Sequence, residues 1–189
     1  MRVILASKSP RRKELLSRII SSFDVVPANI DEDNYPLDII SVLKAKKIGR
    51  LYPNDLIISA DTIVILNHQI LGKPLDEDDA RRMLKMLSSN VHEVSTFYTI
   101  YCEQKNILIT KQVTTRVYFN ELSNDLIEEY VATKSPLDKA GAYGIQDKKF
   151  PLISKIEGDE DNVIGLPLYE LKNDLLSLKI DINELASCL

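Results

Sequence analysis

Residues 91–119 read VHEVSTFYTIYC, EQKN and ILITKQVTTRVYF, in that order. Two long runs rich in β-branched and aromatic residues flank a short polar segment near residues 104–106, which is typical of a β-hairpin. We therefore predict two strands, Val91–Cys102 and Ile107–Phe119, joined by a turn. Because a hairpin is antiparallel, parallel strands elsewhere in the chain would make the sheet a mixed one.

The segments on both sides of the hairpin alternate between strand and helix patterns. Upstream, we expect strands at 2–6, 23–27, 55–60 and 63–66, a helix that begins at Pro10, and helices at 38–51 and 76–87. Downstream, we expect strands at 140–145 and 152–156 and helices at 123–133 and 168–178. No repeat or linker interrupts this order. The chain is therefore expected to form one α/β domain, residues 1–189, with helices flanking a mixed sheet.

The composition argues against several classes of protein. The 189 residues include 24 Lys and Arg and 28 Asp and Glu, a net charge of −4. Two distant cysteines, Cys102 and Cys188, indicate a reducing compartment and no disulfide framework. The two histidines, His68 and His92, are too few for an ordinary His/Cys zinc site. No apolar run approaches about 20 residues, so we expect a cytoplasmic protein without a membrane span or signal peptide.

Basic charge gathers at the N-terminus, where the first eighteen residues carry a net charge of +5. If Ser9 caps the first helix and Pro10 begins it, Arg11 and Arg12 occupy a first turn in which the helix dipole disfavours cations by ~0.3–1 kcal/mol. Free N–H groups, two guanidinium groups and the Ser7 hydroxyl would together bind a phosphate chain. A solvated basic helix start is the alternative. Because the basic charge is confined to this short segment, it favours binding of a small anion over binding of polymeric nucleic acid.

Five blocks of sequence resemble one known family. They are LASKSPRRKELL (5–16), ADTIV (60–64), LGKP (71–74), PLDKAGAYGIQ (136–146) and GLPL (165–168). In this order, the blocks are similar to those of the Maf family of nucleoside triphosphate pyrophosphatases, also called septum formation inhibitors. Together they span nearly the whole chain.

The resemblance implies an elongated α/β fold with a mixed central sheet and two lobes separated by a cleft, like that of the inosine triphosphate pyrophosphatases. It implies a hydrolase that acts on a phosphorus-containing anhydride and releases pyrophosphate from a nucleoside triphosphate. It also implies a divalent cation, Mg²⁺ or Mn²⁺, and a homodimer. The expected partner is a nucleoside triphosphate, with no membrane and no polymeric nucleic acid.

Asp61 is the candidate catalytic centre. It reads as a residue at a strand end inside an otherwise apolar run, where an unpaired carboxylate is costly. From the residues alone, an Asp in a turn or bulge is the alternative. The family's catalytic proton acceptor matches Asp61. We hypothesise that its pKa is raised above about 3.9, or that it acts chiefly by holding a metal ion and its water.

Three further charged residues are expected in the active site. Glu32 matches a functionally important glutamate of the family and is expected to bind the metal with the catalytic aspartate, although the acidic run around it also reads as a solvated loop. Lys44 matches a family lysine, but Lys46 and Lys47 lie close by and leave the register open. Lys73, in a Gly-Lys-Pro loop, is expected to contact phosphate as a point charge.

Substrate choice in the family follows three positions, which correspond to Arg11, Thr62 and Gln146. This combination resembles the dTTP/UTP subgroup. A glutamine amide can both donate and accept, which suits the edge of a pyrimidine. Relatives that act on 7-methyl-GTP differ at these positions. Asp147 stands where the family usually has glycine, which restricts positive φ in that loop, and residues 160–161 are acidic where relatives often carry aromatic residues.

The leading prediction is a metal-dependent pyrophosphatase that removes dTTP, UTP and modified pyrimidine triphosphates from the nucleotide pool. A non-enzymatic, nucleotide-binding regulator of septum formation and a pyrophosphatase for 7-methyl-GTP are the alternatives. Asp61, Glu32 and Lys73 favour an enzyme, because binding alone requires no base beside the phosphates. We further predict that Arg12 and Asp61, 49 positions apart, face one cleft.

Overall fold

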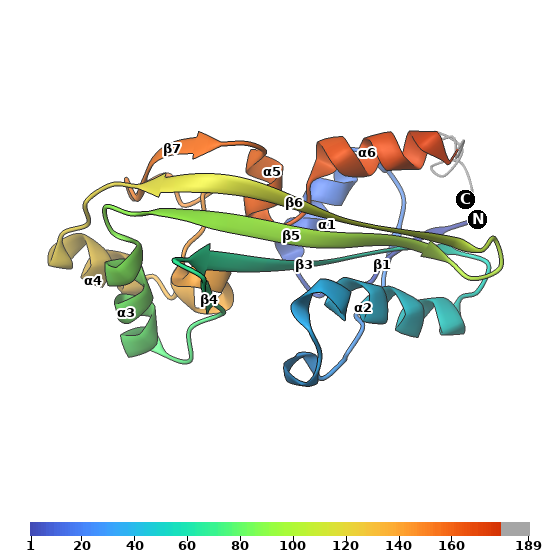
Figure 1. Ribbon diagram of the computed structural model, residues 1–189, viewed down its shortest axis with the longest axis horizontal. Coiled ribbons are helices and arrows are strands. Elements are labelled where there is room, and N and C mark those ends of the chain that lie inside the picture. The colour runs from blue at the N-terminus through green and yellow to red at the C-terminus, as the bar shows by residue number, and fades with distance from the viewer. Residues whose placement is uncertain (179–189) are drawn as a thin grey trace. The chain divides into compact units, whose positions relative to one another are not determined.

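The computed structural model describes residues 1–178, and its elements are labelled in Figure 1. Seven strands in this part of the chain form one sheet, in the order β2-β1-β3-β5-β6-β7, with β4 paired to β3. Strand β1 is parallel to β2 and β3, whereas β4 is antiparallel to β3 and β7 is antiparallel to β6. The sheet is therefore mixed, as predicted. The strands are β1 Val3–Leu5, β2 Asp24–Val25, β3 Leu56–Leu66, β4 Gln69–Leu71, β5 Val91–Cys102, β6 Ile107–Phe119 and β7 Ile153–Glu157.

The helices begin and end close to the predicted positions. Over residues 1–178 the α-helices are α1 Pro10–Ser17, α2 Leu37–Leu51, α3 Glu77–Leu87, α4 Asn124–Ala132, α5 Glu160–Ile164 and α6 Leu168–Ser177, and 3₁₀ helices cover Glu32–Asn34, Ser135–Asp138 and Ala140–Ala142. Ser9 caps α1 and Ser123 caps α4, each accepting a backbone N–H three residues on. The sequence did not predict β4, α5 or the 3₁₀ helices.

The chain divides into two compact units. Within the described residues, unit 1 comprises Met1–Asp61, Thr96–Val113 and 165–178. In this unit α2 packs against β1 and β3 through a small apolar cluster, Ile4, Ala6, Ala45, Ile48 and Ile57. Helix α6 lies on the other side of these strands in Figure 1. Its Asp174 accepts a hydrogen bond from the buried Tyr98 hydroxyl of β5 at 2.6 Å, which attaches α6 to the sheet.

Unit 2 comprises Thr62–Ser95 and Thr114–Ile164 and has its own core. Helix α3 turns the predicted apolar stripe inward, with Ala80, Met83, Leu84 and Leu87 all buried. Helix α4 adds Ile127, Tyr130 and Val131 to the same hydrophobic cluster. Both helices also pack against the 3₁₀ helix Ser135–Asp138, which precedes the loop that carries Gln146.

The predicted strand at 140–145 is wrong, because its backbone turns there. Gly141 has φ of +69° and Ala142 has φ of +61°, both in the left-handed region, and residues 140–142 form a 3₁₀ turn. A Cβ at Gly141 would lie 3.0 Å from a methyl group of Val64. Close packing against β3, together with a left-handed backbone, therefore explains both the turn and the glycine.

The predicted position of Asp61 at a strand end is also wrong. Strand β3 runs without interruption from Leu56 to Leu66, and Asp61 is its sixth residue rather than a strand end. An extended backbone accepts a polar side chain where a partner compensates its charge, and Asp61 has such a partner in Lys44. The strand therefore carries the carboxylate on a regular, rigid element.

No helix in residues 1–178 combines the length and apolar character that crossing a membrane requires. Cys102 is a buried free thiol in β5. Cys188 lies outside the described residues.

Candidate functional site

The first turn of α1 carries cations and no acidic residue, as predicted. Pro10 occupies the first helical position, and the Ser9 side chain accepts the Arg12 backbone N–H at 3.4 Å. Ser9 is itself held by Ser7, whose buried hydroxyl accepts the Ser9 N–H at 3.2 Å. The sequence Ser-Lys-Ser-Pro therefore shapes the turn that presents Arg11 and Arg12.

The Arg12 side chain is fixed from two directions. Its Nε donates to the Gly165 carbonyl at 2.8 Å, and one terminal nitrogen donates to Ser7 Oγ at 3.4 Å. Burial lowers the pKa of Arg12 from its ordinary value, while the charges of Asp61 and Glu32 act in the opposite direction. Arg12 therefore interacts electrostatically with both carboxylates that the sequence assigned to the site.

Lys44 joins the two carboxylates. Its Nζ lies 2.7 Å from Glu32 Oε1 and 2.9 Å from Asp61 Oδ1. The Lys44 side chain is 9% exposed and that of Asp61 is 13% exposed, whereas Glu32 is about half exposed at 48%. One buried ammonium group thus holds an acidic side chain from the 3₁₀ helix after β2 and another from β3.

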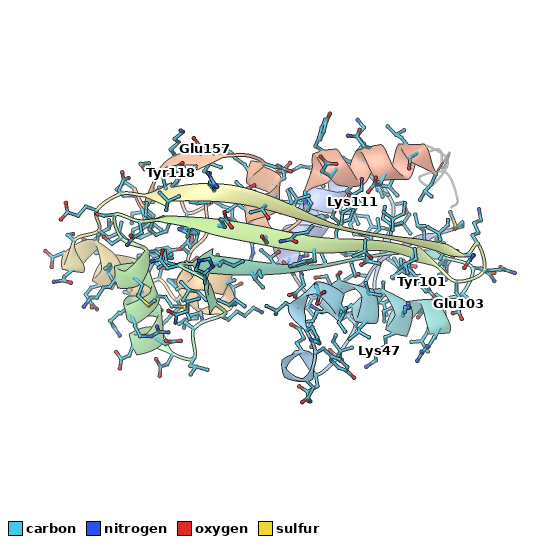
Figure 2. All side chains as sticks on the ribbon, in the orientation of Figure 1. Lys47, Tyr101, Glu103, Lys111, Tyr118 and Glu157 are labelled. Carbon is cyan, nitrogen blue, oxygen red and sulfur yellow. The ribbon has the colours of Figure 1, made fainter. Side chains whose placement is uncertain are left out.

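The structure resolves which lysine of α2 faces this group. Lys44 turns inward, and Lys47, labelled in Figure 2, donates instead to the carbonyl of Asn29. Ile40, Lys44 and Ile48 recur every four residues and are all buried. This helical spacing could have identified Lys44 from the sequence, because it places the lysine on the apolar stripe of α2.

Unit 1 therefore brings together Ser7, Arg12, Glu32, Lys44 and Asp61. Arg11 belongs to the same turn, and its charge also acts on Arg12. The arrangement offers guanidinium and hydroxyl donors for phosphate oxygens beside a carboxylate fixed by a lysine. The sequence did not indicate the Gly165 carbonyl, because a backbone acceptor has no side-chain pattern, although the GLPL block contains it.

The carboxylates fit a metal ion only in a limited sense. Among the described residues, no group of three or more His, Cys, Asp and Glu could enclose a metal. Mg²⁺, however, is commonly bound by one or two carboxylates together with substrate phosphates. Glu32 and Asp61, joined through Lys44, are such a pair. Because Lys44 contacts one oxygen of each, a cation that arrives with a triphosphate would have to use their second oxygens.

The remaining candidates belong to unit 2. Thr62 follows Asp61 on β3 and is partly exposed, and Lys73 is exposed in the loop after β4. Gln146 is also exposed and lines an open pocket of about 300 Å³; the other residues of this pocket are Thr133, Ser135, Asp147, Lys148, Lys149 and Phe150. Asp147 does not adopt positive φ, so the concern that a side chain restricts this loop does not apply.

A comparison with known protein families matches this chain over most of its length. The family described as "Maf-like protein" matches residues 2–178. A dTTP/UTP pyrophosphatase of Clostridium beijerinckii is 46% identical over 182 residues, which cover 91% of this chain and 96% of the relative. A dTTP/UTP pyrophosphatase of Pyrococcus furiosus is 48% identical over 176 residues, which cover 88% of this chain and 90% of the relative.

Among solved structures, the Staphylococcus aureus Ham1 protein is similar to this chain. The TM-score is 0.53 at 11% sequence identity, and the match covers 95% of this chain and 100% of that protein. At this identity the likeness concerns the fold alone. Together with the observed strand order, it confirms the predicted α/β fold with a mixed central sheet.

Proposed function

The chain belongs to the family of Maf-like proteins, and on that premise we propose that it hydrolyses dTTP and UTP to the monophosphate and pyrophosphate. Relatives at 46% and 48% identity over most of the chain are dTTP/UTP pyrophosphatases. The observation that carries the proposal is the group formed by Lys44, Glu32 and Asp61, on which the charge of Arg12 also acts. A binding protein would need the cations but no carboxylate held at a fixed position beside them.

Arg11 and Arg12 are proposed to bind the triphosphate. Guanidinium groups bind phosphate oxygens through two parallel hydrogen bonds, and the positive end of the α1 dipole adds to the attraction. The Gly165 carbonyl holds Arg12 through Nε, so the four other N–H donors of the guanidinium group all lie on its terminal nitrogens. The Ser7 hydroxyl offers a further donor beside them.

Asp61 is proposed to orient the attacking water and accept its proton as the water adds to the α-phosphorus. The bond between the α-phosphorus and the bridging oxygen then breaks, and pyrophosphate leaves. Lys44 donates to Asp61 Oδ1 and so fixes this carboxylate on β3. General base catalysis of this kind typically contributes about 10²–10⁴ in rate. Arg12 and Lys44 supply positive charge where charge develops on the phosphates.

Glu32 and Asp61 are the residues that would hold Mg²⁺ or Mn²⁺. When bound, such an ion would neutralise charge on the phosphates. In unit 2, Lys73 is proposed as a further phosphate contact, and Thr62 and Gln146, with Arg11 of unit 1, as the residues that select the base. The amide of Gln146 suits a pyrimidine edge, which presents both carbonyl groups and a ring N–H.

A panel assay tests the proposal. The protein is incubated with dTTP, UTP, CTP, GTP and 7-methyl-GTP in the presence of Mg²⁺ or Mn²⁺, and released pyrophosphate is measured. We expect release from dTTP and UTP, and a fall of at least about 100-fold in the Asp61→Asn variant. Release from no substrate would favour a nucleotide-binding regulator. Release from 7-methyl-GTP alone would refute the assignment to dTTP and UTP.

The homodimer and the cleft rest on the family resemblance, the cytoplasmic location rests on the composition, and all three stay predictions. Size-exclusion chromatography with light scattering tests the first of them on the purified chain. A monomer at all concentrations used in the assay would contradict the predicted homodimer without affecting the proposed activity.

A further inference from the structure

Gln146 belongs to a tightly hydrogen-bonded turn in unit 2. The Asp147 N–H donates to the Gly144 carbonyl at 3.2 Å, and the Lys148 N–H donates to the Gln146 carbonyl at 2.8 Å. The Phe150 N–H then donates to the Asp147 carbonyl at 2.9 Å. The backbone on both sides of Gln146 is therefore fixed by its own turn, although the Gln146 side chain is exposed.

A buried tyrosine ties both sides of this turn to α4. The Tyr130 hydroxyl donates to Asp147 Oδ2 at 2.6 Å and accepts the Gly144 N–H at 3.0 Å. The Ser135 hydroxyl donates to the same Asp147 oxygen at 2.8 Å. Tyr130 is fully buried, and its ring lies 4.9 Å from that of Phe150, which ends the turn. One phenol group thus holds the residue two before Gln146 and the residue after it.

Two neighbours make the arrangement more specific. Lys139 Nζ donates to the Ser135 hydroxyl at 2.8 Å, which leaves the Ser135 proton directed to Asp147. At Gly144, a Cβ would lie 2.8 Å from Gln146 Oε1 and 2.8 Å from Lys139 Cε. The amide of Gln146 therefore packs over Gly144 in space that any other residue would fill.

We propose that Tyr130 and Asp147, with Ser135, are positioning residues that hold Gln146 for selection of the base, an inference that rests on the proposed function. An amide on a flexible side chain can rotate to satisfy different bases. A fixed amide is matched to one pattern of donors and acceptors, and other bases leave one or more of its hydrogen bonds unmade. Selectivity should then depend on groups that never touch the substrate.

The chemistry of the network supports this role. Burial, and after it the hydrogen bond to Asp147, raise the pKa of Tyr130 above its ordinary value of 10.0, so the phenol remains a donor throughout the neutral range. Asp147 stands where the family resemblance leads us to expect glycine, which would have no carboxylate to accept these bonds. This chain therefore holds the turn with a side chain that glycine could not replace.

The test compares two tyrosines of unit 2 that each donate to a carboxylate. Tyr130→Phe removes the hydroxyl that holds the turn. Tyr118→Phe removes an exposed hydroxyl that donates to Glu157 at 2.7 Å between β6 and β7. Figure 2 labels Tyr118 and Glu157. For each protein, kcat and KM are measured with dTTP, UTP, CTP and GTP, and Tm is measured by calorimetry.

We expect Tyr130→Phe to lower the ratio of kcat/KM for dTTP to that for GTP by about tenfold or more, mainly through a higher KM for dTTP. Tyr118→Phe should leave the ratio unchanged. Asp147→Ala should reproduce the loss, and Asp147→Asn should restore most of the ratio because its amide oxygen can still accept from Tyr130 and Ser135. If Tyr130→Phe does not fold, the dTTP to GTP ratios of the two Asp147 variants test the proposal instead.

Two outcomes would overturn the inference in different ways. If Tyr130→Phe and Asp147→Ala lower Tm but keep the wild-type ratio, the network is structural only and the proposed function is unaffected. If the wild-type protein releases pyrophosphate from none of these substrates, the proposed function fails and the inference fails with it. The wild-type measurement therefore separates the two failures.

Discussion

Helices α1 and α3 both begin with a capping side chain, but their first turns carry opposite charge. Ser9 caps α1, and the turn that follows contains Arg11 and Arg12 and no acidic residue. Asp76 caps α3 by accepting the Asp79 N–H at 2.8 Å, and that first turn is Glu77, Asp78 and Asp79. The positive end of a helix favours the second arrangement and disfavours the first by ~0.3–1 kcal/mol per charge.

The difference separates a helix start built for stability from one built for binding. On α3, the acidic side chains are satisfied within unit 2: Arg82 contacts Asp79 at 2.6 Å and Arg81 contacts Asp78 at 2.8 Å. On α1, no acidic residue of the first turn accompanies the cations, and Arg12 instead donates to the Gly165 carbonyl and the Ser7 hydroxyl. We interpret the unfavourable charge at α1 as the cost of a phosphate site, and the following predictions test that interpretation.

The largest effect is expected for Arg12→Ala. Loss of a fixed guanidinium group should lower kcat/KM for dTTP by about 100- to 1,000-fold, as removal of one preorganised donor does elsewhere. Arg81→Ala is the matched control. It removes an arginine of α3 that forms ion pairs with Asp78 and Glu128 and that is not proposed to bind substrate. Steady-state kinetics with dTTP measure both variants. Equal losses in the two proteins would contradict the division between the two helix starts.

Arg11→Glu is expected to lower activity by less than Arg12→Ala does and to raise stability. The substitution gives α1 the charge that α3 already has and removes repulsion from Arg12. We expect the free energy of unfolding to rise by up to about 1 kcal/mol, and kcat/KM to fall by about tenfold or more because the triphosphate meets a carboxylate. Urea unfolding and the pyrophosphate assay provide the two readouts. A variant that is both less stable and fully active would refute this prediction.

The sequence predicted much of the fold because long elements carry strong local patterns. The hairpin strands end where their alternation and polar turn indicate, and α1 begins at the Ser-Pro pair. The turn at 140–145 could not be predicted, because Ala142 adopts positive φ and alanine gives no sign of that conformation. Its cause is packing against β3, which depends on residues distant in the sequence.

The candidate site was predictable in part for a different reason. The basic helix start indicated Arg12, the resemblance assigned Glu32, Asp61 and, with its register open, Lys44, and the structure brings these residues together in unit 1. Local patterns misplaced Asp61 at a strand end, since a carboxylate in an apolar run reads as an interruption. Its partner Lys44 comes from α2, and no pattern along β3 could indicate that partner.

A moderate effect on stability is expected at the caps. Asp76→Ala should lower the free energy of unfolding by about 1 kcal/mol, the usual value of a lost cap, and leave kcat/KM unchanged. Ser9→Ala is the matched variant on α1. It should lower stability by a similar amount and also reduce activity, because Ser9 shapes the turn that carries Arg12. Chemical denaturation and dTTP kinetics test both. A lower kcat/KM in Asp76→Ala would show that the α3 cap also contributes to activity.

The smallest effect concerns the acid side of the stability curve. The Leu75 N–H, and after it the side chain of Arg82, lower the pKa of Asp79 from its usual 3.8. A carboxylate with a lowered folded-state pKa stabilises the protein above its unfolded pKa, and this contribution is lost as the pH falls through the folded value. The stability difference between wild type and Asp79→Asn should therefore be largest near pH 7 and shrink as the pH falls below about 3.8. Urea unfolding at pH 7, 4 and 3 measures it, and a difference that grows toward acid would show that the acidic first turn of α3 is not what stabilises that helix.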